Sequence, residues 1–380
     1  MTVATESRRA GEPVHRGKVT TWLSKVFELN PAGLNWPRAV AFLDAALVPM
    51  FVFWAIGHEE YLLSALFGLL FAALADPGGS YGHRALHISI FALIGAGVTA
   101  LAFGIGSDAW GWLTSVSFVV TLVAGLAAAF GVRRFVNALL LNVWFIVALG
   151  FEFSIHEEGH ITSYVWAQVL SWTGGAVLWI TVAFLWWLIR GRTDQGQPFS
   201  ELPGDTSRRK LTRPLVLFAV IRAVVIGGTV ALAFGLDLSY GYWIPIAAIV
   251  ALKPSLEQAA LAGAQRLVGA SMGAIVAALL LWVPAGEHGL RLFAVHRGLE
   301  VVALVLLMHG AGIRFWNYTL YTAAIAAGVL VLIDLPQPSD NAAEGYRVLW
   351  TLCGVGISLI VMLLAGLLAK RTAQTPAQPA

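Results

Sequence analysis

Two short segments of the chain repeat an arginine, a phenylalanine and an asparagine at the same spacing. Residues 134–137 read Arg-Phe-Val-Asn and residues 314–317 read Arg-Phe-Trp-Asn. A guanidinium group binds a carboxylate through two parallel hydrogen bonds, and an asparagine three residues on lies one helical turn deeper on the same face. The pattern predicts a paired site for organic anions, although anchoring of positive charge at a membrane surface also explains the arginines. The candidate ligands are Arg134, Asn137, Arg314 and Asn317.

A second segment, residues 156–160, reads His-Glu-Glu-Gly-His and fits the zinc-hydrolase pattern His-Glu-x-x-His. Gly159 weakens the helix that the pattern needs, and no acidic residue occurs between Ile161 and Thr193 to act as a third ligand. A phosphate-binding glycine loop is also missing from the sequence. We therefore expect no metal, no cofactor and no enzymatic activity.

Ionisable residues inside apolar runs form a third group of candidates, because burying a charge in a membrane costs at least a few kcal/mol. They include Asp44, Arg222, Arg297 and Glu300. Arg297 and Glu300 are three residues apart and can pair on a helix. Asp44 lies about 9 Å into the first apolar run at 1.5 Å per residue, where it would carry a proton or pair with an arginine such as Arg222.

The composition indicates the kind of structure that must position these residues. Hydrophobic residues make up 58% of the 380 residues, charged residues only 12%, and the mean hydropathy is +0.76. A soluble domain would carry about 25% charged residues, so this chain predicts an all-α polytopic membrane protein. The net charge of +3 gives no support for a nucleic-acid partner. The single cysteine, Cys353, excludes an intramolecular disulfide.

The apolar runs suggest about twelve membrane spans, of which two are shorter than the roughly 20 residues of a full span. The short ones are 60–75 and 240–252. The others are 38–56, 87–105, 109–130, 134–151, 161–189, 214–235, 267–284, 292–311, 315–333 and 345–369.

Lysine and arginine collect in alternate loops, and aspartate and glutamate in the others. Because basic loops stay in the cytoplasm, the pattern places the N and C termini and the loop 190–213 in the cytoplasm. The protein is therefore expected to be a multi-pass membrane protein.

The loop 190–213 separates two blocks with similar landmarks in the same order. Besides the Arg-Phe-x-Asn segments, Asp76-Pro77 and Lys253-Pro254 each end the second span of a block. An even number of spans in each block predicts two parallel six-span repeats related by an axis along the membrane normal. The expected organisation is a cytoplasmic segment with an amphipathic surface helix (1–37), repeats at 38–189 and 214–369, the linker 190–213, and a disordered tail (370–380).

The stretch from Tyr242 to Ala274 is the most specific part of the sequence. It combines a Trp-led span ending in Lys-Pro-Ser with Arg266-x-x-Gly269-x-x-x-Gly273 in the following run. This stretch resembles the fusaric acid resistance (FUSC) family of inner-membrane aromatic acid exporters, and the chain is distantly similar to aluminium-activated malate transporters. Gly269 and Gly273 lie on one helix face and would let a neighbouring helix approach closely.

The resemblance implies a location in the bacterial inner membrane and export of small organic acid anions, aromatic ones among them. A proton gradient or the membrane potential would drive the export. A periplasmic adaptor protein, by resemblance, and further copies of the chain are the partners to consider besides the lipid bilayer. Two alternatives stay open: a passive organic-anion channel, and a membrane scaffold that transports nothing.

Overall fold

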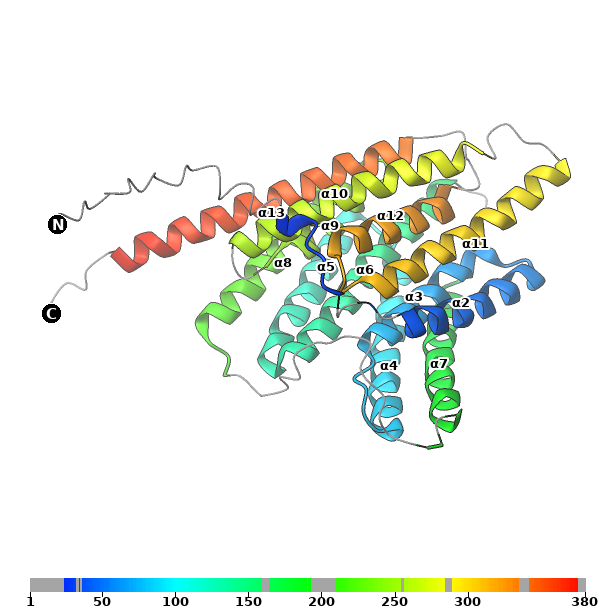
Figure 1. Ribbon diagram of the computed structural model, residues 1–380. Helices are drawn as coiled ribbons and strands as arrows, with labels where there is room; N and C mark the ends of the chain where they lie inside the picture. The colour runs from blue at the N-terminus through cyan, green and yellow to red at the C-terminus, as the bar shows by residue number, and fades with distance from the viewer. Residues whose placement is uncertain are drawn as a thin grey trace, which may run out of the picture.

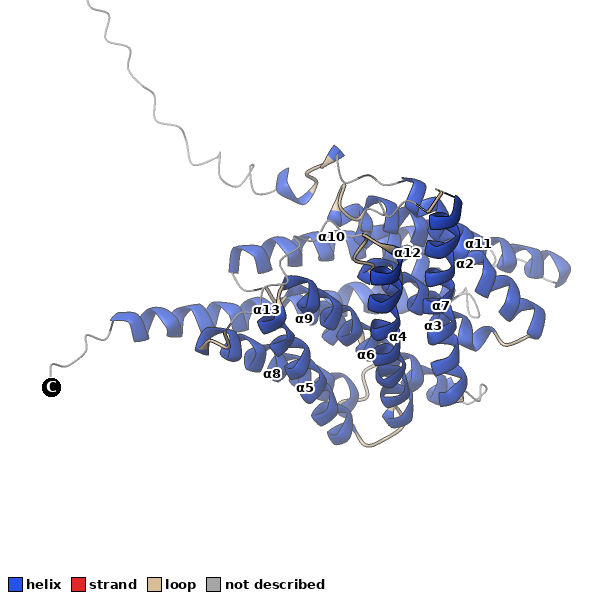
Figure 2. Cartoon of the chain, turned by 90° about the horizontal axis from the view of Figure 1, so that it is seen from below, coloured by secondary structure: helices blue, strands red, loops and turns tan. Residues whose placement is uncertain are grey.

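The structure is a computed structural model that describes residues 24–31, 34, 36–158, 164–189, 191–192, 210–253, 256–283, 289–334 and 342–374. Within these residues every regular element is a helix (Figure 2). The α-helices are α2 (Trp36–Ile56), α3 (Leu62–Ala75), α4 (Tyr81–Ile105), α5 (Trp110–Leu126), α6 (Val132–Glu158), α7 (Val165–Ile189), α8 (Arg213–Gly235), α9 (Trp243–Ala251), α10 (Leu256–Leu281), α11 (Gly289–Ile313), α12 (Tyr318–Asp334) and α13 (Ala342–Gln374). Two short 3-10 turns, η2 (Glu59–Tyr61) and η3 (Ala127–Phe130), join the series.

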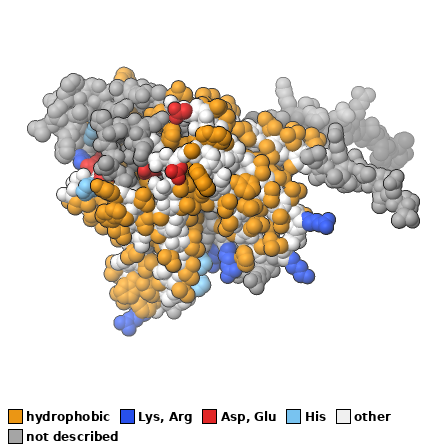
Figure 3. Space-filling model, turned by 180° about the vertical axis from the view of Figure 1, so that it is seen from behind, with side chains coloured by type: hydrophobic (Ala, Val, Ile, Leu, Met, Phe, Trp, Pro, Cys, Tyr) orange, Lys and Arg blue, Asp and Glu red, His pale blue; other side chains and the backbone are white. Residues whose placement is uncertain are grey.

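Nine helices among the described residues are long and apolar enough to cross a membrane. The three others are α3, α9 and α12, with 14, 9 and 17 residues. Hydrophobic side chains are spread over the described part of the molecular face shown in Figure 3, as expected for a surface in contact with lipid. These features confirm an all-helical, multi-pass membrane protein, whereas the twelve-span layout stays a prediction.

The two shortest helices lie in the interior of the bundle. All but one residue of α3 and all but one residue of α9 are buried, so neither helix faces lipid over its length. Each packs along one long helix, α3 on α7 and α9 on α13. Glycines permit this contact, because a Cβ atom at Gly175 of α7 or Gly354 of α13 would collide with a backbone carbonyl of the short helix.

The helix pairs of the first half of the chain have counterparts in the second half. Helix α4 packs on α6 and α7, and α10 packs on α12 and α13. Helix α5 packs on α6, and α11 packs on α12. The halves meet where α5 packs on α8 and where α11 packs on α2 (Figure 1). Two interfaces between helices of corresponding position therefore join the halves.

Candidate functional site

A cavity of about 220 Å³ lies in the centre of the bundle, between α3 and α6 of the first half and α9 and α12 of the second. Its middle is apolar and is lined by Phe67, Val143, Val147, Ile246 and Ile325. A cavity of about 150 Å³ suffices to bind benzene, so this one has room for a six-membered ring with a small polar group. Its charged side chains lie near the two ends of α9.

One end of the cavity, the Lys253 end, is formed by Lys253, Arg266 and Arg314. Arg266 is a hydrogen-bond partner of Tyr318, and the Arg314 guanidinium lies 5.6 Å from the ring centre of Tyr321. Among the described residues, none of the three basic side chains forms an ion pair with a carboxylate.

Two nitrogen atoms at the Lys253 end lack acceptors. The Nε of Arg266 and one terminal nitrogen of Arg314 are buried and have no hydrogen-bond partner among the residues that the structure describes. A buried donor without an acceptor is costly, and the cost is larger for a charged group. The geometry at this end therefore matches an anion that would supply the missing acceptors.

Lys253 follows the last turn of α9, outside the candidate spans. Burial, and to a smaller extent the positive charges of Arg222, Arg314 and Arg266, together lower the pKa of its ammonium group from 10.5 to about 8. An anion bound among these groups would favour the protonated lysine. The charge at this end therefore depends on pH near neutrality.

The opposite end of the cavity, the Arg347 end, is formed by Trp243 at the start of α9 and Arg347 near the start of α13. Both side chains are buried, with 6% and 5% of their surface exposed. The Arg347 guanidinium lies over the Trp243 indole, 3.8 Å from the ring centre. This contact is a close cation–π interaction inside the protein.

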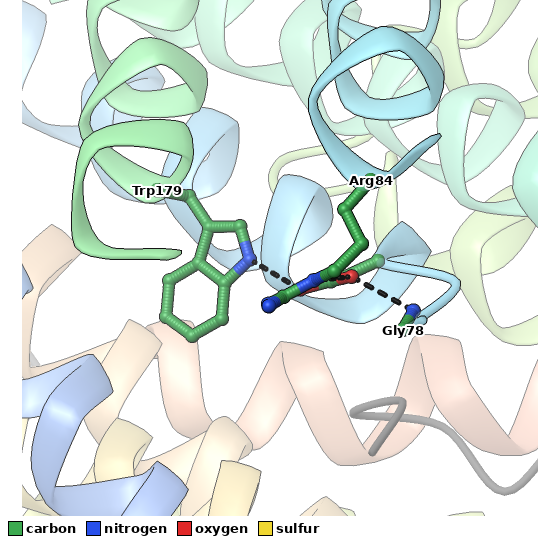
Figure 4. Close-up of polar contacts among 4 residues, drawn as sticks. Gly78, Arg84 and Trp179 are labelled. Atoms are coloured by element: carbon green, nitrogen blue, oxygen red, sulfur yellow. Dashed lines mark hydrogen bonds and ion pairs between the residues drawn. The ribbon is translucent and has the colours of Figure 1, made fainter. Parts of the chain in front are cut away.

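The end of α3 carries an acidic residue where the end of α9 carries Lys253. Asp76 is neutralised by Arg84, whose guanidinium donates to the two carboxylate oxygens at 2.9 and 2.5 Å (Figure 4). The backbone N–H of Gly78 and the indole of Trp179 donate to the same carboxylate at 3.0 and 3.2 Å. The charge of Asp76 is thus satisfied within the protein, while the three basic residues of the Lys253 end have no such carboxylate among the residues that the structure describes.

The two Arg-Phe-x-Asn segments occupy different surroundings. Arg314 lines the cavity, whereas Arg134 is exposed, lies 5.9 Å from the ring centre of Phe130 and is not among the lining residues. Asn317 caps α12 by accepting from the Leu320 N–H at 2.8 Å. The fold brings only Arg314 of the four candidate ligands to the cavity.

The remaining two members of this group bind other parts of the protein. Asn317 also donates to the backbone of Glu28, which fixes the described part of the N-terminal segment against α12. The side-chain nitrogen of Asn137 lies 3.1 Å from a ring nitrogen of His87 on α4. Of the amphipathic helix expected in residues 1–37, only Ser24–Phe27 falls within the described residues, and Val26 there is buried.

Arg222 and Asp44 do not form an ion pair with each other. Arg222 is 3% exposed, donates to the Ile249 carbonyl at 2.9 Å and lies over the Phe135 ring, so it holds the end of α9 against α6 and α8. Asp44 is exposed on α2 and forms no ion pair with a described residue. Its expected role in proton transfer stays a prediction.

Arg297 and Glu300 pair as their spacing suggests, with N–O distances of 3.0 and 3.2 Å. Arg297 also binds Glu59 of η2 and lies 4.6 Å from the centre of the Trp54 ring. These contacts connect α11 of the second half to η2 and α2 of the first half. They lie away from the cavity, because none of these residues lines it.

Gly269 and Gly273 lie at the contact between α10 and α12. A Cβ atom at Gly269 would lie 2.6 Å from the Thr319 carbonyl oxygen, and one at Gly273 would lie 2.6 Å from that of Ala323. Close packing of these helices holds Arg266, which is on α10, beside the cavity.

The sequence predictions missed the role of three basic residues: Lys253, Arg266 and Arg347. Arg266 directly precedes the apolar run 267–284 expected from the sequence, but the structure places it ten residues after the start of α10 and inside the candidate span Gln258–Leu281. A position at that depth requires a partner or a function. The side chains of residues 156–160 lie outside the described part, and no group of three metal-ligating side chains occurs within it.

Comparison with known families gives one match. Residues 224–361 match the family described as fusaric acid resistance protein-like. No match was found among curated proteins or among solved structures. The matched region extends from α8 to α13 and includes the complete Lys253 end of the cavity. The resemblance drawn from Tyr242–Ala274 is therefore confirmed, because residues 224–361 of this membrane protein are similar to the fusaric acid resistance protein-like family.

Proposed function

We propose that the protein exports small organic acid anions, aromatic ones among them, through the central cavity. The observation that carries the proposal is the Lys253 end, where two buried arginine nitrogens lack acceptors and no described carboxylate pairs with the three cations. A carboxylate would fill this end through charge-assisted hydrogen bonds. The apolar middle of the cavity would hold the ring.

The direction of transport follows from the distribution of charge along the chain. If basic loops lie in the cytoplasm, the Lys253 end faces the cytoplasm and the Arg347 end faces outward. An anion that leaves the cell moves toward the positive side of a bacterial inner membrane, which is worth about 2.3 kcal/mol per charge at 100 mV. The membrane potential is then sufficient to drive export, and a proton gradient would add to it.

The position of the cavity agrees with a duplicated architecture. It is lined by α3 and α9 and by α6 and α12, which occupy corresponding places in the two halves. Transporters built from two repeats bind their substrates between the repeats. The proposed repeats are residues 38–189 and 214–369, joined by the linker 190–213.

Flux measurements in proteoliposomes test the proposal. Benzoate efflux should depend on an imposed membrane potential and should show saturation. Arg314→Gln should raise the half-saturating concentration about ten-fold or more, because a charge-assisted contact is worth at least about 1.4 kcal/mol. The matched control is Arg213→Gln, which removes an exposed charge at the start of α8 and should leave transport unchanged.

Other outcomes of this experiment identify the alternatives. Flux that stays proportional to concentration would indicate a passive channel. No flux of any carboxylate through folded protein would contradict transport and favour a scaffold. An equal effect of Arg134→Gln and Arg314→Gln would support the paired site expected from the two Arg-Phe-x-Asn segments.

A further inference from the structure

Binding of an anion at the Lys253 end does not explain the features of the Arg347 end of the cavity. Trp243 and Arg347 are buried, come from different helices, and both line the cavity. The guanidinium carbon lies over the indole, 3.8 Å from its ring centre, so the two side chains are in direct contact. This arrangement places a second basic group at the cavity, away from the Lys253 end.

The indole N–H of Trp243 adds a second, independent observation. It is buried and has no hydrogen-bond acceptor among the described residues. A buried tryptophan N–H normally finds a hydrogen-bond acceptor, so the lack of an acceptor for Trp243 among the described residues needs an explanation. An anionic oxygen that contacts the Arg347 guanidinium would also satisfy this donor if it lay at the edge of the indole.

The two ends are too far apart to be a single small-anion site. Trp243 and Lys253 are ten residues apart along a segment that is mainly the helix α9, which corresponds to about 15 Å. Apolar side chains such as Ile246 and Val250 line the cavity between them. A carboxylate of benzoate size cannot contact both ends at once.

We infer that Trp243 and Arg347 form a second carboxylate-binding site, at which the anion is held before release. The inference rests on the proposed function and extends it to two anions bound in series in one cavity. Division of the path into two sites lets each anion bind firmly enough to enter and weakly enough to leave. An incoming anion at the Lys253 end would repel the anion at the Arg347 end and promote its release.

Equilibrium dialysis of radiolabelled benzoate against the full-length protein in lipid nanodiscs tests the inference. The wild type should bind two benzoate ions per chain at saturation. Arg347→Gln should bind one, and Arg314→Gln should retain the other. Trp243→Phe keeps the ring beneath Arg347 and removes the N–H donor, so it should weaken one of the two sites about three- to ten-fold.

Controls keep the result interpretable if a variant folds poorly. Trp282→Phe changes an exposed tryptophan and should preserve both sites with unchanged affinity. Arg347→Lys keeps the charge but loses the planar group, and it should weaken the same site that Trp243→Phe weakens. Size-exclusion profiles identify variants that are not folded.

The outcomes separate this inference from the proposed function. One benzoate ion per wild-type chain, lost in Arg314→Gln and unaffected by Arg347→Gln and Trp243→Phe, would overturn the second site and leave the proposed function standing. Absence of benzoate binding to folded wild-type protein would overturn both.

Discussion

Asp76 and Lys253 occupy matching places at the ends of α3 and α9, but their surroundings differ. Arg84, Gly78 and Trp179 satisfy the aspartate. Lys253 instead lies among Arg222, Arg266 and Arg314, which lower its pKa in addition to the larger effect of burial. Lys253, together with Arg266 and Arg314, gives the cavity its positive charge at this end.

The lowered pKa of Lys253 predicts that anion binding depends on pH. With a pKa of about 8, the lysine is charged below pH 8 and becomes neutral as the pH rises through that value. Benzoate affinity should therefore be highest below pH 7 and should fall between pH 7 and 9. Binding above pH 8 should be accompanied by proton uptake, because the bound anion favours the charged lysine.

Calorimetric titration at several pH values measures both effects. In Lys253→Arg the charge persists throughout this range, so the affinity should stay constant between pH 7 and 9. An equally steep loss of affinity in this variant would assign the pH dependence to another group.

At the scale of helices, two short and almost fully buried helices determine the site. Helices α3 and α9 contribute two of the four walls of the cavity, and each lies against a glycine of a longer helix. A buried helix of 9 or 14 residues cannot be positioned by contact with lipid headgroups on both sides. Its position depends on packing against α13 or α7.

Adjacent glycines of α7 provide a test of this dependence. A methyl group at Gly175 would collide with the Ala65 carbonyl of α3, while one at Gly174 would meet no atom within 4 Å. Gly175→Ala should destabilise the protein by about 1–3 kcal/mol through overpacking. Gly174→Ala should be neutral or stabilising by up to about 1 kcal/mol, because alanine favours the helix.

Thermal unfolding of the two purified variants gives the comparison. Only Gly175→Ala should lower the unfolding temperature, and it should also reduce benzoate flux because α3 lines the cavity. Equal unfolding temperatures of the two variants would contradict the expectation that the position of α3 depends on close packing against α7.

At the scale of the whole molecule, two interfaces join the halves, one between α5 and α8 and the other between α2 and α11. Helices from both halves also surround the cavity. These contacts do not involve the linker, so the covalent connection is expected to be dispensable. The polar composition of residues 190–213 agrees with this view.

Co-expression of residues 1–200 with residues 201–380 tests the independence of the halves. The two fragments should assemble in the membrane, co-purify and restore benzoate export. Each fragment alone should give no export, because half of the cavity wall would be missing. Stable insertion of both fragments without restored export would assign a role to the linker itself.

Much of the architecture follows from local properties of the sequence. Long apolar runs must form helices in lipid, since every backbone N–H and C=O needs an internal partner there, and Gly, Pro and charged residues mark where the runs end. For this reason each predicted span overlaps an observed helix, and the shortness of α3 and α9 was also visible. The family resemblance rested on the sequence of α9 and α10 and was confirmed for residues 224–361.

The composition of the site was decided by tertiary structure. Similar local sequence around Arg134 and Arg314 gives no information on which side chain turns toward the cavity, because that depends on how four helices from distant parts of the chain pack together. The same is true of Arg347 and Trp243, which are 104 positions apart in the sequence and in contact in the fold. Pairing of Asp76 with Arg84, and the lack of a described carboxylate beside Lys253, likewise depend on three-dimensional neighbours. Helices form from interactions between residues near in sequence, whereas the charge of a cavity is set by residues that only folding brings together.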